Sequence, residues 1–295
     1  MDLVVDLGQS GARYKVGTDV VALSIAKNSE DPVVLTVEKI FQQIPKQEFS
    51  AVALSLTGLQ GDVADPRPYG ELSHKYFNSK NVCIMDDGIA SYVGSLGSKS
   101  GIVLTLGGGV VAIAANGGHF GHADGKGPIF GDFGGGFWIG QSALSKAIST
   151  IDGRDNYDDL VELLKVELSK YRSLENKTGI EASLLCIETA KIVTKGAADG
   201  VISAYSILES GAKYLSATIE SAWRKVADKN GQIPVLSIKG GLSQSKDYVQ
   251  LIQKFTAERI NFEYLETTGD NLAGATKAAE VFTSDVTPLL KWWRA

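Results

Sequence analysis

The apolar and polar positions form short strand-like runs in the first 125 residues and longer helical patterns after residue 140. Apolar runs that end in glycine or acidic residues predict buried strands. Four such runs come first: "LVVDLG", "ARYKVG", "AVALSLTGL" and "NVCIMDD". A helical pattern at residues 33–44 separates the second run from the third. This order predicts an α/β fold.

Two apolar stripes beyond residue 140 follow the i, i+3, i+4 spacing of a helix. They cover residues 157–171 and residues 201–222, and we expect both to face a core. The runs "VLSIKGG" and "RINFEYL" then predict two more strands, each followed by a helical pattern. The second part of the chain therefore predicts another α/β lobe.

The uncharged stretch at residues 101–120 is about as long as a membrane span. Its glycines, at positions 107, 108, 109, 117 and 118, interrupt the roughly 20 apolar residues that a span needs. We expect two buried strands joined by a glycine turn, and no membrane association.

Two segments share one plan of strand, glycine turn and strand: "LVVDLGQSGARYKV" and "GIVLTLGGGVVAIA". Such turns align backbone N–H groups, which bind phosphate oxygens. A turn with positive φ would explain one or two glycines without a ligand. The three glycines at 107–109 favour phosphate, whereas both explanations stay open for "LGQSG". A further pair, Gly240 and Gly241, ends a strand before a helix expected near Ser243, where a nucleotide can lie.

Composition narrows the class of protein. The 295 residues are 44% hydrophobic and 21% charged, which is enough for two lobes. The net charge of -5 and the lack of a Lys/Arg run argue against nucleic-acid or anionic-membrane partners. Cys83 and Cys186 are too few for a disulfide framework and lack metal-ligand spacing. The start has no basic region before its apolar run, so we expect no secretory signal and a cytoplasmic location.

Two acidic motifs carry candidate chemistry. Asp86 and Asp87 end an apolar strand, and because Asp is a preferred N-cap, one of the two carboxylates is expected to cap the next helix. In "IFGDFGGGFWIG", Asp132 stands alone in a glycine-rich backbone. We expect Phe137 and Trp138 to anchor the following helix, with stacking on a ligand as the alternative.

The order of these motifs along the chain resembles that of the BadF/BadG/BcrA/BcrD-type ATPases. Within this family it is most similar to the N-acetylglucosamine kinase branch of the sugar kinase/actin/Hsp70 superfamily. The resemblance runs from about residue 2 to about residue 281 and is most specific at "GDFGGGFWIG". It implies a two-lobed actin-like ATPase fold with a ribonuclease-H-like core in each lobe and a cleft between them. We expect lobes at residues 1–99 and 100–295, the second with a helical insertion; return of the C-terminal helix to the first lobe stays open.

The resemblance also implies ATP and Mg²⁺ as cofactors and a role for each motif residue. Asp87 would be the catalytic base, Asp86 the cap, and Asp6 would help to place Mg²⁺. ATP would contact Gly8, Gln9, Ser10, Gly107, Gly108, Gly109, Ala197, Gly240, Gly241 and Gln244. The sugar would contact Thr57, Asp87, Gly125, Lys126, Gly127 and Asp132.

Some positions depart from the family pattern. A hydroxyl residue is usual where Gly108 stands, an acid or small residue at Phe133, a serine at Gly135, and Trp and His at Lys126 and Pro128. The expected function is ATP-dependent phosphorylation of a hydroxyl of an amino sugar or hexose, with a possible homodimer. Two alternatives stay open: a sugar- or nucleotide-sensing protein with a degenerate site, and an iron–sulfur ATPase that activates a reductase or dehydratase.

The terminal segment "TPLLKWWRA" is expected to be either an apolar docking segment or a frayed tail.

Overall fold

The computed structural model describes residues 2–8, 11–25, 31–228, 231–267, 269–286 and 288–295. The chain forms two compact units. Unit 1 comprises Met1–Val103 and Thr267–Ala295, and unit 2 comprises Leu104–Glu266. Each unit is built on one sheet, and the boundary between the units falls within strand β6.

The sheet of unit 1 has the strand order β11-β5-β4-β1-β2-β3. Its strands are β1 (Leu3–Leu7), β2 (Ala12–Val16), β3 (Asp19–Leu23), β4 (Val52–Leu56), β5 (Asn81–Asp86) and β11 (Leu290–Arg294). Strands β1, β4 and β5 run parallel to one another, and β2, β3 and β11 run antiparallel to their neighbours. The parallel strands are buried almost throughout because helices cover both faces, which explains their continuous apolar runs.

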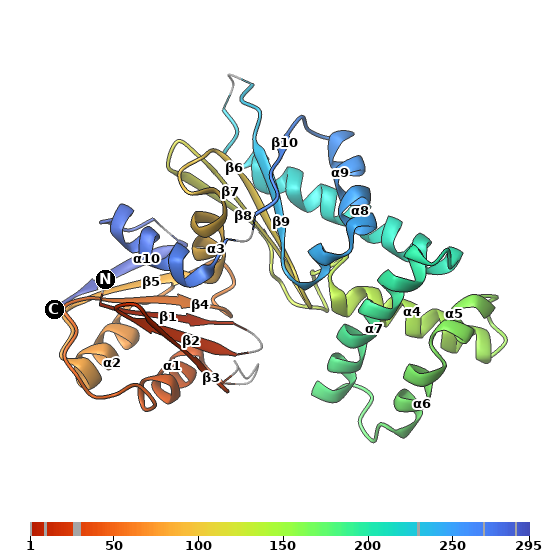
Figure 1. Ribbon diagram of the computed structural model, residues 1–295, viewed down its shortest axis with the longest axis horizontal. Helices are drawn as coiled ribbons and strands as arrows, with labels where there is room; N and C mark the ends of the chain where they lie inside the picture. Colours follow the sequence, from red (N-terminus) through yellow and green to blue (C-terminus); the bar gives the residue numbers. More distant parts are fainter. Residues whose placement is uncertain (1, 9–10, 26–30, 229–230, 268, 287) are drawn as a thin grey trace. The chain divides into compact units, whose positions relative to one another are not determined.

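Four helices cover this sheet: α1 (Val33–Phe41), α2 (Arg67–Phe77), α3 (Asp87–Leu96) and α10 (Asn271–Val281). Figure 1 shows α1 and α2 on one face and α3 and α10 on the other. The core under α1 and α2 includes Phe41 and Phe77, whose ring centroids lie 4.8 Å apart.

The sheet of unit 2 has the strand order β10-β9-β6-β7-β8. Its strands are β6 (Gly101–Leu106), β7 (Val110–Asn116), β8 (His119–Asp124), β9 (Val235–Lys239) and β10 (Glu263–Tyr264). In both sheets the first three strands of the unit lie side by side in sequence order. The fourth strand pairs with the free edge of the first, and the fifth pairs with the fourth. This shared order is that of a ribonuclease-H-like core, so the expected α/β fold with two such cores is confirmed. The two similar sequence segments are the opening hairpins of the two sheets.

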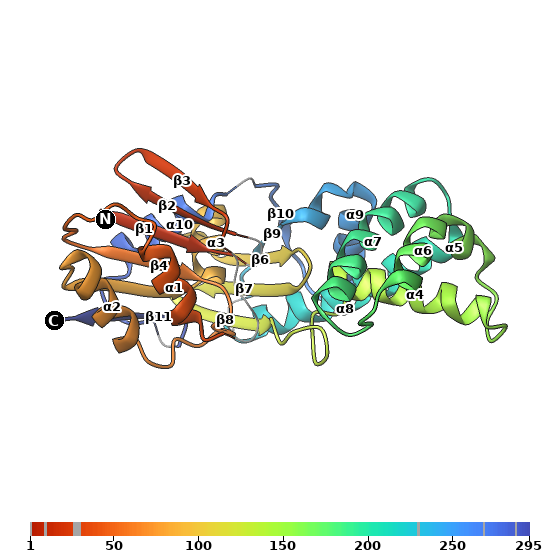
Figure 2. The ribbon, with the colours of Figure 1, turned by 90° about the horizontal axis from the view of Figure 1, so that it is seen from below.

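The helices of unit 2 are α4 (Gly136–Ile151), α5 (Asp158–Leu163), α6 (Lys165–Ser173), α7 (Ile180–Ala198), α8 (Ile202–Arg224), the 3₁₀ turn η1 (Gly241–Gln244) and α9 (Lys246–Ala257). Figure 2 shows α4 to α7 gathered beyond one end of the unit 2 sheet. The helix predicted from residues 201–222 is α8. The stripe at residues 157–171 is also helical and buries Leu160, Leu164 and Leu168 as expected, but the chain breaks at Leu164 into α5 and α6.

The expected second lobe at 100–295 ends earlier, because α10 and β11 belong to unit 1; this is the return of the C-terminal helix to the first lobe that the sequence left open. Helix α10 packs against α3 through glycines: a Cβ atom at Gly274 would lie 1.9 Å from the carbonyl oxygen of Ala90. Strand β11 pairs with β5. The terminal segment is therefore not a frayed tail, because its backbone completes the sheet. Of the residues in this segment, Thr287 lies outside the described part of the chain.

Among the described residues, no helix has the length and apolarity needed to cross a membrane. The uncharged stretch at 101–120 forms β6, β7 and the start of β8, as the strand interpretation predicted.

Candidate functional site

The carboxyl ends of the parallel strands of unit 1 gather several predicted site residues at one edge. Leu7, Leu56 and Asp86 lie opposite one another in the register of β1, β4 and β5. The N–H of Thr57 donates to the carbonyl of Leu7 at 2.9 Å, so Thr57 lies beside the end of β1. Ligands of α/β folds bind at this kind of edge.

Gly8 begins the loop between β1 and β2, and its N–H donates to the carbonyl of Gly11 at 2.9 Å. Gln9 and Ser10, the other residues expected at the ATP phosphates in this loop, lie outside the described residues. The structure therefore places the base of this loop at the edge where β1, β4 and β5 end.

Asp86 caps α3, as expected. One carboxylate oxygen accepts the N–H of Gly88 at 3.0 Å, and the other accepts the N–H of Gly61 at 3.0 Å. The residue is only 4% exposed, so both oxygens are used inside the protein. The carboxylate of Asp86 therefore ties the loop after β4 to the start of α3.

Asp87 is the first residue of α3 and is partly buried. Burial, followed by the negative charges of Asp86 and Asp6, raises its pKa to about 7; hydrogen bonds from the Thr57 hydroxyl and the Gly88 N–H oppose this shift. A carboxyl with a pKa near neutral pH is suited to accept a proton from a substrate hydroxyl. Its role as the base stays a prediction.

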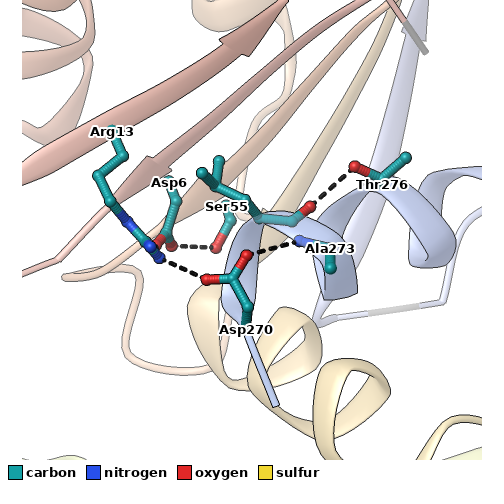
Figure 3. A network of polar contacts seen from close by, with 7 residues as sticks. Asp6, Arg13, Ser55, Asp270, Ala273 and Thr276 are labelled. Carbon is teal, nitrogen blue, oxygen red and sulfur yellow. Dashed lines mark hydrogen bonds and ion pairs between the residues drawn. The ribbon is translucent and has the colours of Figure 1, made fainter. Parts of the chain in front are cut away.

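Figure 3 shows the polar network around Asp6, which is 7% exposed on β1. One oxygen of Asp6 accepts the Ser55 hydroxyl at 3.0 Å, and the other accepts the Arg13 guanidinium at 2.9 Å. The same guanidinium nitrogen lies 2.9 Å from a carboxylate oxygen of Asp270, which also caps α10 through the N–H of Ala273. Sequence reasoning missed Arg13, although it lies directly opposite Asp6 in the hairpin register.

The hydrogen bonds and ion pair of Asp6 bear on whether its carboxylate could hold Mg²⁺. Among the described residues, no group of three or more His, Cys, Asp or Glu side chains could hold a metal ion. Mg²⁺ in nucleotide sites is commonly held by phosphate oxygens, waters and only one or two carboxylates. Asp6, with both oxygens engaged, fits a role through a bound water better than direct coordination.

The glycine turn of unit 2 rests on the N-terminus of α4. The carbonyls of Gly107 and Gly108 accept the N–H groups of Gly136 and Phe137 at 2.8 and 3.0 Å. A Cβ atom at Gly136 would lie 3.1 Å from the carbonyl oxygen of Gly107, so this contact favours glycine. A Cβ at Gly107 would instead meet no atom within 4 Å, which leaves its surroundings open.

Gly108 occupies a position where the family usually has a hydroxyl residue. A Cβ atom there would lie 2.9 Å from Cδ1 of Ile187, on α7. The side chain of Ile187 thus fills the space that a larger residue at 108 would need.

The pair Gly240 and Gly241 lies beside the glycine turn at residues 107–109. Gly240 has φ +109°, and a Cβ atom there would lie 2.4 Å from the carbonyl oxygen of Leu106, at the end of β6. Gly241 is exposed, with no atom within 4 Å of a Cβ. The ends of β6 and β9 thus bring both glycine segments to one edge of the sheet.

The other residues expected near the nucleotide differ in their settings. Gln244 is exposed in η1, and the helix expected near Ser243 is this short 3₁₀ turn followed by α9 at Lys246. Ala197 is buried near the C-terminal end of α7. Their contacts with a nucleotide stay predictions.

Asp132 is 7% exposed and has a left-handed backbone, with φ +60°. Burial is the main cause that raises its pKa to about 6; the negative charge of Asp124 adds to the shift, and the N–H of Val110 opposes it. That N–H donates to one carboxylate oxygen at 3.2 Å. A Cβ at Gly109 would lie 2.6 Å from the other oxygen, so Asp132 abuts the glycine turn.

The loop before Asp132 carries the other residues predicted to contact sugar. Gly125 (φ +69°) and Gly127 (φ +80°) have left-handed backbones, and Lys126 between them is exposed. The N–H of Gly131 donates to the carbonyl of Gly127 at 2.9 Å, which closes the loop.

Phe137 and Trp138 lie in the first turn of α4 and are partly buried. The Trp138 ring meets Tyr214 of α8 edge-on, with centroids 5.6 Å apart, and Tyr214 also contacts Phe133 at 5.3 Å. Trp138 thus joins α4 to α8, which supports the anchoring interpretation.

Comparison with known proteins identifies the family. The model of the BadF/BadG/BcrA/BcrD ATPase family matches residues 3–279, and the chain belongs to this family. An N-acetyl-D-glucosamine kinase of Dictyostelium discoideum is 28% identical in an alignment of length 217 that covers 68% of this chain and 66% of that protein. The match thus spans just under two thirds of the relative.

Solved structures share the fold. A candidate N-acetylglucosamine kinase from Chromobacterium violaceum aligns with a TM-score of 0.65 and 21% identity, covering 93% of this chain and 98% of that one. A ROK family glucokinase from Streptomyces griseus, solved with glucose and AMPPNP, aligns with a TM-score of 0.59 and 15% identity, covering 95% and 98%. At these identities the likeness shows the fold alone.

Proposed function

We propose that this protein is an ATP-dependent sugar kinase that phosphorylates a hydroxyl of an amino sugar or hexose, with N-acetylglucosamine or glucosamine as the first candidates. The observation that carries the proposal is Asp87, whose carboxyl has a pKa near 7 at the edge where β1, β4 and β5 end. Membership of the ATPase family and the 28% identical kinase of Dictyostelium discoideum support it.

Phosphoryl transfer needs mainly positioning and neutralisation of charge. In unit 1, Asp87 would accept the hydroxyl proton, with Thr57 beside it. The loop from Gly8 through Gln9 and Ser10 would bind phosphate. Bound Mg²⁺ would neutralise phosphate charge, and Asp6 would orient one of its waters.

In unit 2, two glycine segments would serve the nucleotide. Gly107, Gly108 and Gly109 would meet phosphate, and Gly240 with Gly241 would meet adenosine, together with Ala197 and Gln244. The open space around Gly107 and Gly241 supports this assignment, because bare backbone can approach a ligand closely.

The sugar would bind to the acid loop of unit 2. Asp132, largely ionised above pH 6, would accept hydrogen bonds from sugar hydroxyls. Gly125, Lys126 and Gly127 would line the same loop. An exposed cation at Lys126, where the family has an aromatic residue, favours a substrate that need not stack there.

Two alternatives retain specific support. Gly108, which offers no hydroxyl to phosphate, and Lys126 favour a sensing protein that binds without turnover. An ATPase that activates a reductase through an iron–sulfur cluster has less support: Cys83 is fully buried in β5, and burial raises the pKa of its thiol.

The test is a screen of N-acetylglucosamine, glucosamine, N-acetylmannosamine and glucose with Mg-ATP, following ADP release. We expect turnover of at least one sugar. We also expect Mg-ATP at 100 times its Kd to stabilise the protein by about 2.7 kcal/mol in thermal denaturation. Sugar and ATP binding without ADP release would favour the sensor, and the absence of any ATP-dependent stabilisation would refute the kinase.

We further propose a cytoplasmic location and a homodimer, on the support of the family resemblance and, for the location, of two cysteines without a disulfide. Light scattering of the purified protein measures the mass directly, and 31.3 kDa would contradict the dimer.

A further inference from the structure

Asp124 ends strand β8, eight residues before Asp132. One oxygen of its carboxylate accepts the backbone N–H of Asp132 at 2.8 Å. The other oxygen accepts the hydroxyl of Thr218, on α8, at 3.4 Å. The side chain of Asp124 therefore links β8, α8 and the loop that carries the candidate sugar-binding acid.

These contacts form part of a closed ring. The carboxylate of Asp132 accepts the N–H of Val110, at the start of β7, at 3.2 Å. The carbonyl of Val110 accepts the N–H of Gly125 at 2.8 Å, and Gly125 directly follows Asp124. Two hydrogen bonds thus join the two ends of the loop to Val110, the first residue after the glycine turn, and a third joins the ends to each other.

The ring holds an uncommon backbone in place. Asp124 and Asp132 both have left-handed backbones, with φ +67° and +60°, which cost free energy in residues other than glycine. A Cβ at Gly131 would lie 2.4 Å from the Asp124 oxygen that binds Asp132, so glycine makes room for the contact. Such conformations persist only where surrounding contacts determine them.

Charge is the second feature of the pair. The carboxylates of Asp124 and Asp132 repel each other, and this repulsion adds to burial in raising the pKa of Asp132. Charged or titratable groups around the pair include Lys126 in the loop, His122 on β8 and Lys225 at the end of α8, whose ammonium donates to the carbonyl of His122.

We propose that Asp124 is a positioning residue: its carboxylate fixes the backbone and charge state of Asp132, and so holds the sugar-binding acid against the glycine turn at Gly109. This inference rests on the proposed function for the role of Asp132. It explains why an acid stands at the end of β8, where its side chain faces a second acid.

Two substitutions separate geometry from charge. In Asp124→Asn the amide oxygen can still accept the N–H of Asp132, but the charge is lost. In Asp124→Ala both are lost. Asp155→Asn is the matched control, since Asp155 also accepts a hydroxyl, that of Ser149, within unit 2 but in the segment between α4 and α5.

The first measurement needs no substrate. Carboxyl ¹³C NMR titration follows Asp132, assigned by comparison with Asp132→Asn. We expect the Asp132 midpoint to lie lower in Asp124→Asn than in the wild type, and to be unchanged in Asp155→Asn. An unchanged midpoint in Asp124→Asn overturns the inference whether or not the protein turns over a sugar.

The second measurement uses N-acetylglucosamine and Mg-ATP. We expect Asp124→Ala to raise KM for the sugar about tenfold or more, because a buried hydrogen bond to a charged group is lost. KM for ATP should be unchanged. Asp124→Asn should raise KM for the sugar less. In this variant, sugar affinity should begin to fall at a lower pH on acidification than in the wild type. If both variants match the wild type while it turns over sugar, the inference fails and the proposed function stands.

Discussion

Replacing Asp87 with Asn should abolish most activity and yet stabilise the protein. The pKa of Asp87 is raised from the ordinary value of 3.8 to about 7, mainly by burial and then by Asp86 and Asp6. At about 1.4 kcal/mol per pKa unit, the ionised carboxylate costs the folded state as much as about 4 kcal/mol above pH 7. Asn carries no charge and escapes this cost.

The pH dependence follows from the sign of the shift. Below the unfolded pKa, near pH 4, the carboxyl is neutral in both states and contributes its full stability. That stability is lost as pH rises through the folded pKa. The advantage of Asp87→Asn over the wild type should therefore grow between about pH 4 and pH 7 and then level off. Turnover should fall by about 10²–10⁴-fold, the usual contribution of a general base.

Asp86→Asn is the matched contrast. Asp86 accepts one N–H on each oxygen, from Gly88 and Gly61. An amide can accept only one of them, so stability should fall by about 1.5–3 kcal/mol. Each kcal/mol corresponds to about 2–4 °C in Tm for a chain somewhat smaller than this one. Turnover of the folded protein should stay within about tenfold of the wild type.

The assay combines thermal denaturation from pH 4.5 to 8.5 with steady-state turnover at pH 8 on the sugar found by screening. Loss of activity in Asp86→Asn with activity kept in Asp87→Asn would move the base by one residue. A Tm of Asp87→Asn that falls relative to the wild type as pH rises would refute the electrostatic argument.

Two further predictions use matched pairs. Gly109→Ala should raise KM for the sugar, because its Cβ would lie 2.6 Å from a carboxylate oxygen of Asp132. Gly107→Ala has open space around its Cβ, so it should leave Tm unchanged and weaken Mg-ATP binding. Equal behaviour of the two variants in binding assays would contradict this. In chemical denaturation, Tyr248→Phe should lower stability by about 1–3 kcal/mol, because the fully buried hydroxyl donates to the carbonyl of Gly134 at 2.7 Å. Tyr157→Phe should cost less stability, because the hydroxyl of Tyr157 is partly buried and accepts from Lys146. A loss in Tyr248→Phe no larger than in Tyr157→Phe would contradict the second.

Much of the architecture was predictable because it depends on local patterns. Apolar runs ended by glycine marked the opening hairpins of both sheets, and the long stripe at residues 201–222 marked α8. The preference of Asp for helix N-termini predicted the cap at Asp86, since the cap is made with residues next to it in sequence. The glycine turn at 107–109 was visible for the same reason.

Tertiary structure alone decided which distant residues meet. Thr218 reaches Asp124 from 94 residues away, and Asp270 reaches Arg13 from the far end of the chain. The terminal segment had no local signal for its place, because a strand at a sheet edge is defined by its partner, here β5. The charge states of Asp87 and Asp132 depend on burial and on neighbouring carboxylates, and both arise only when separate strands and loops pack together.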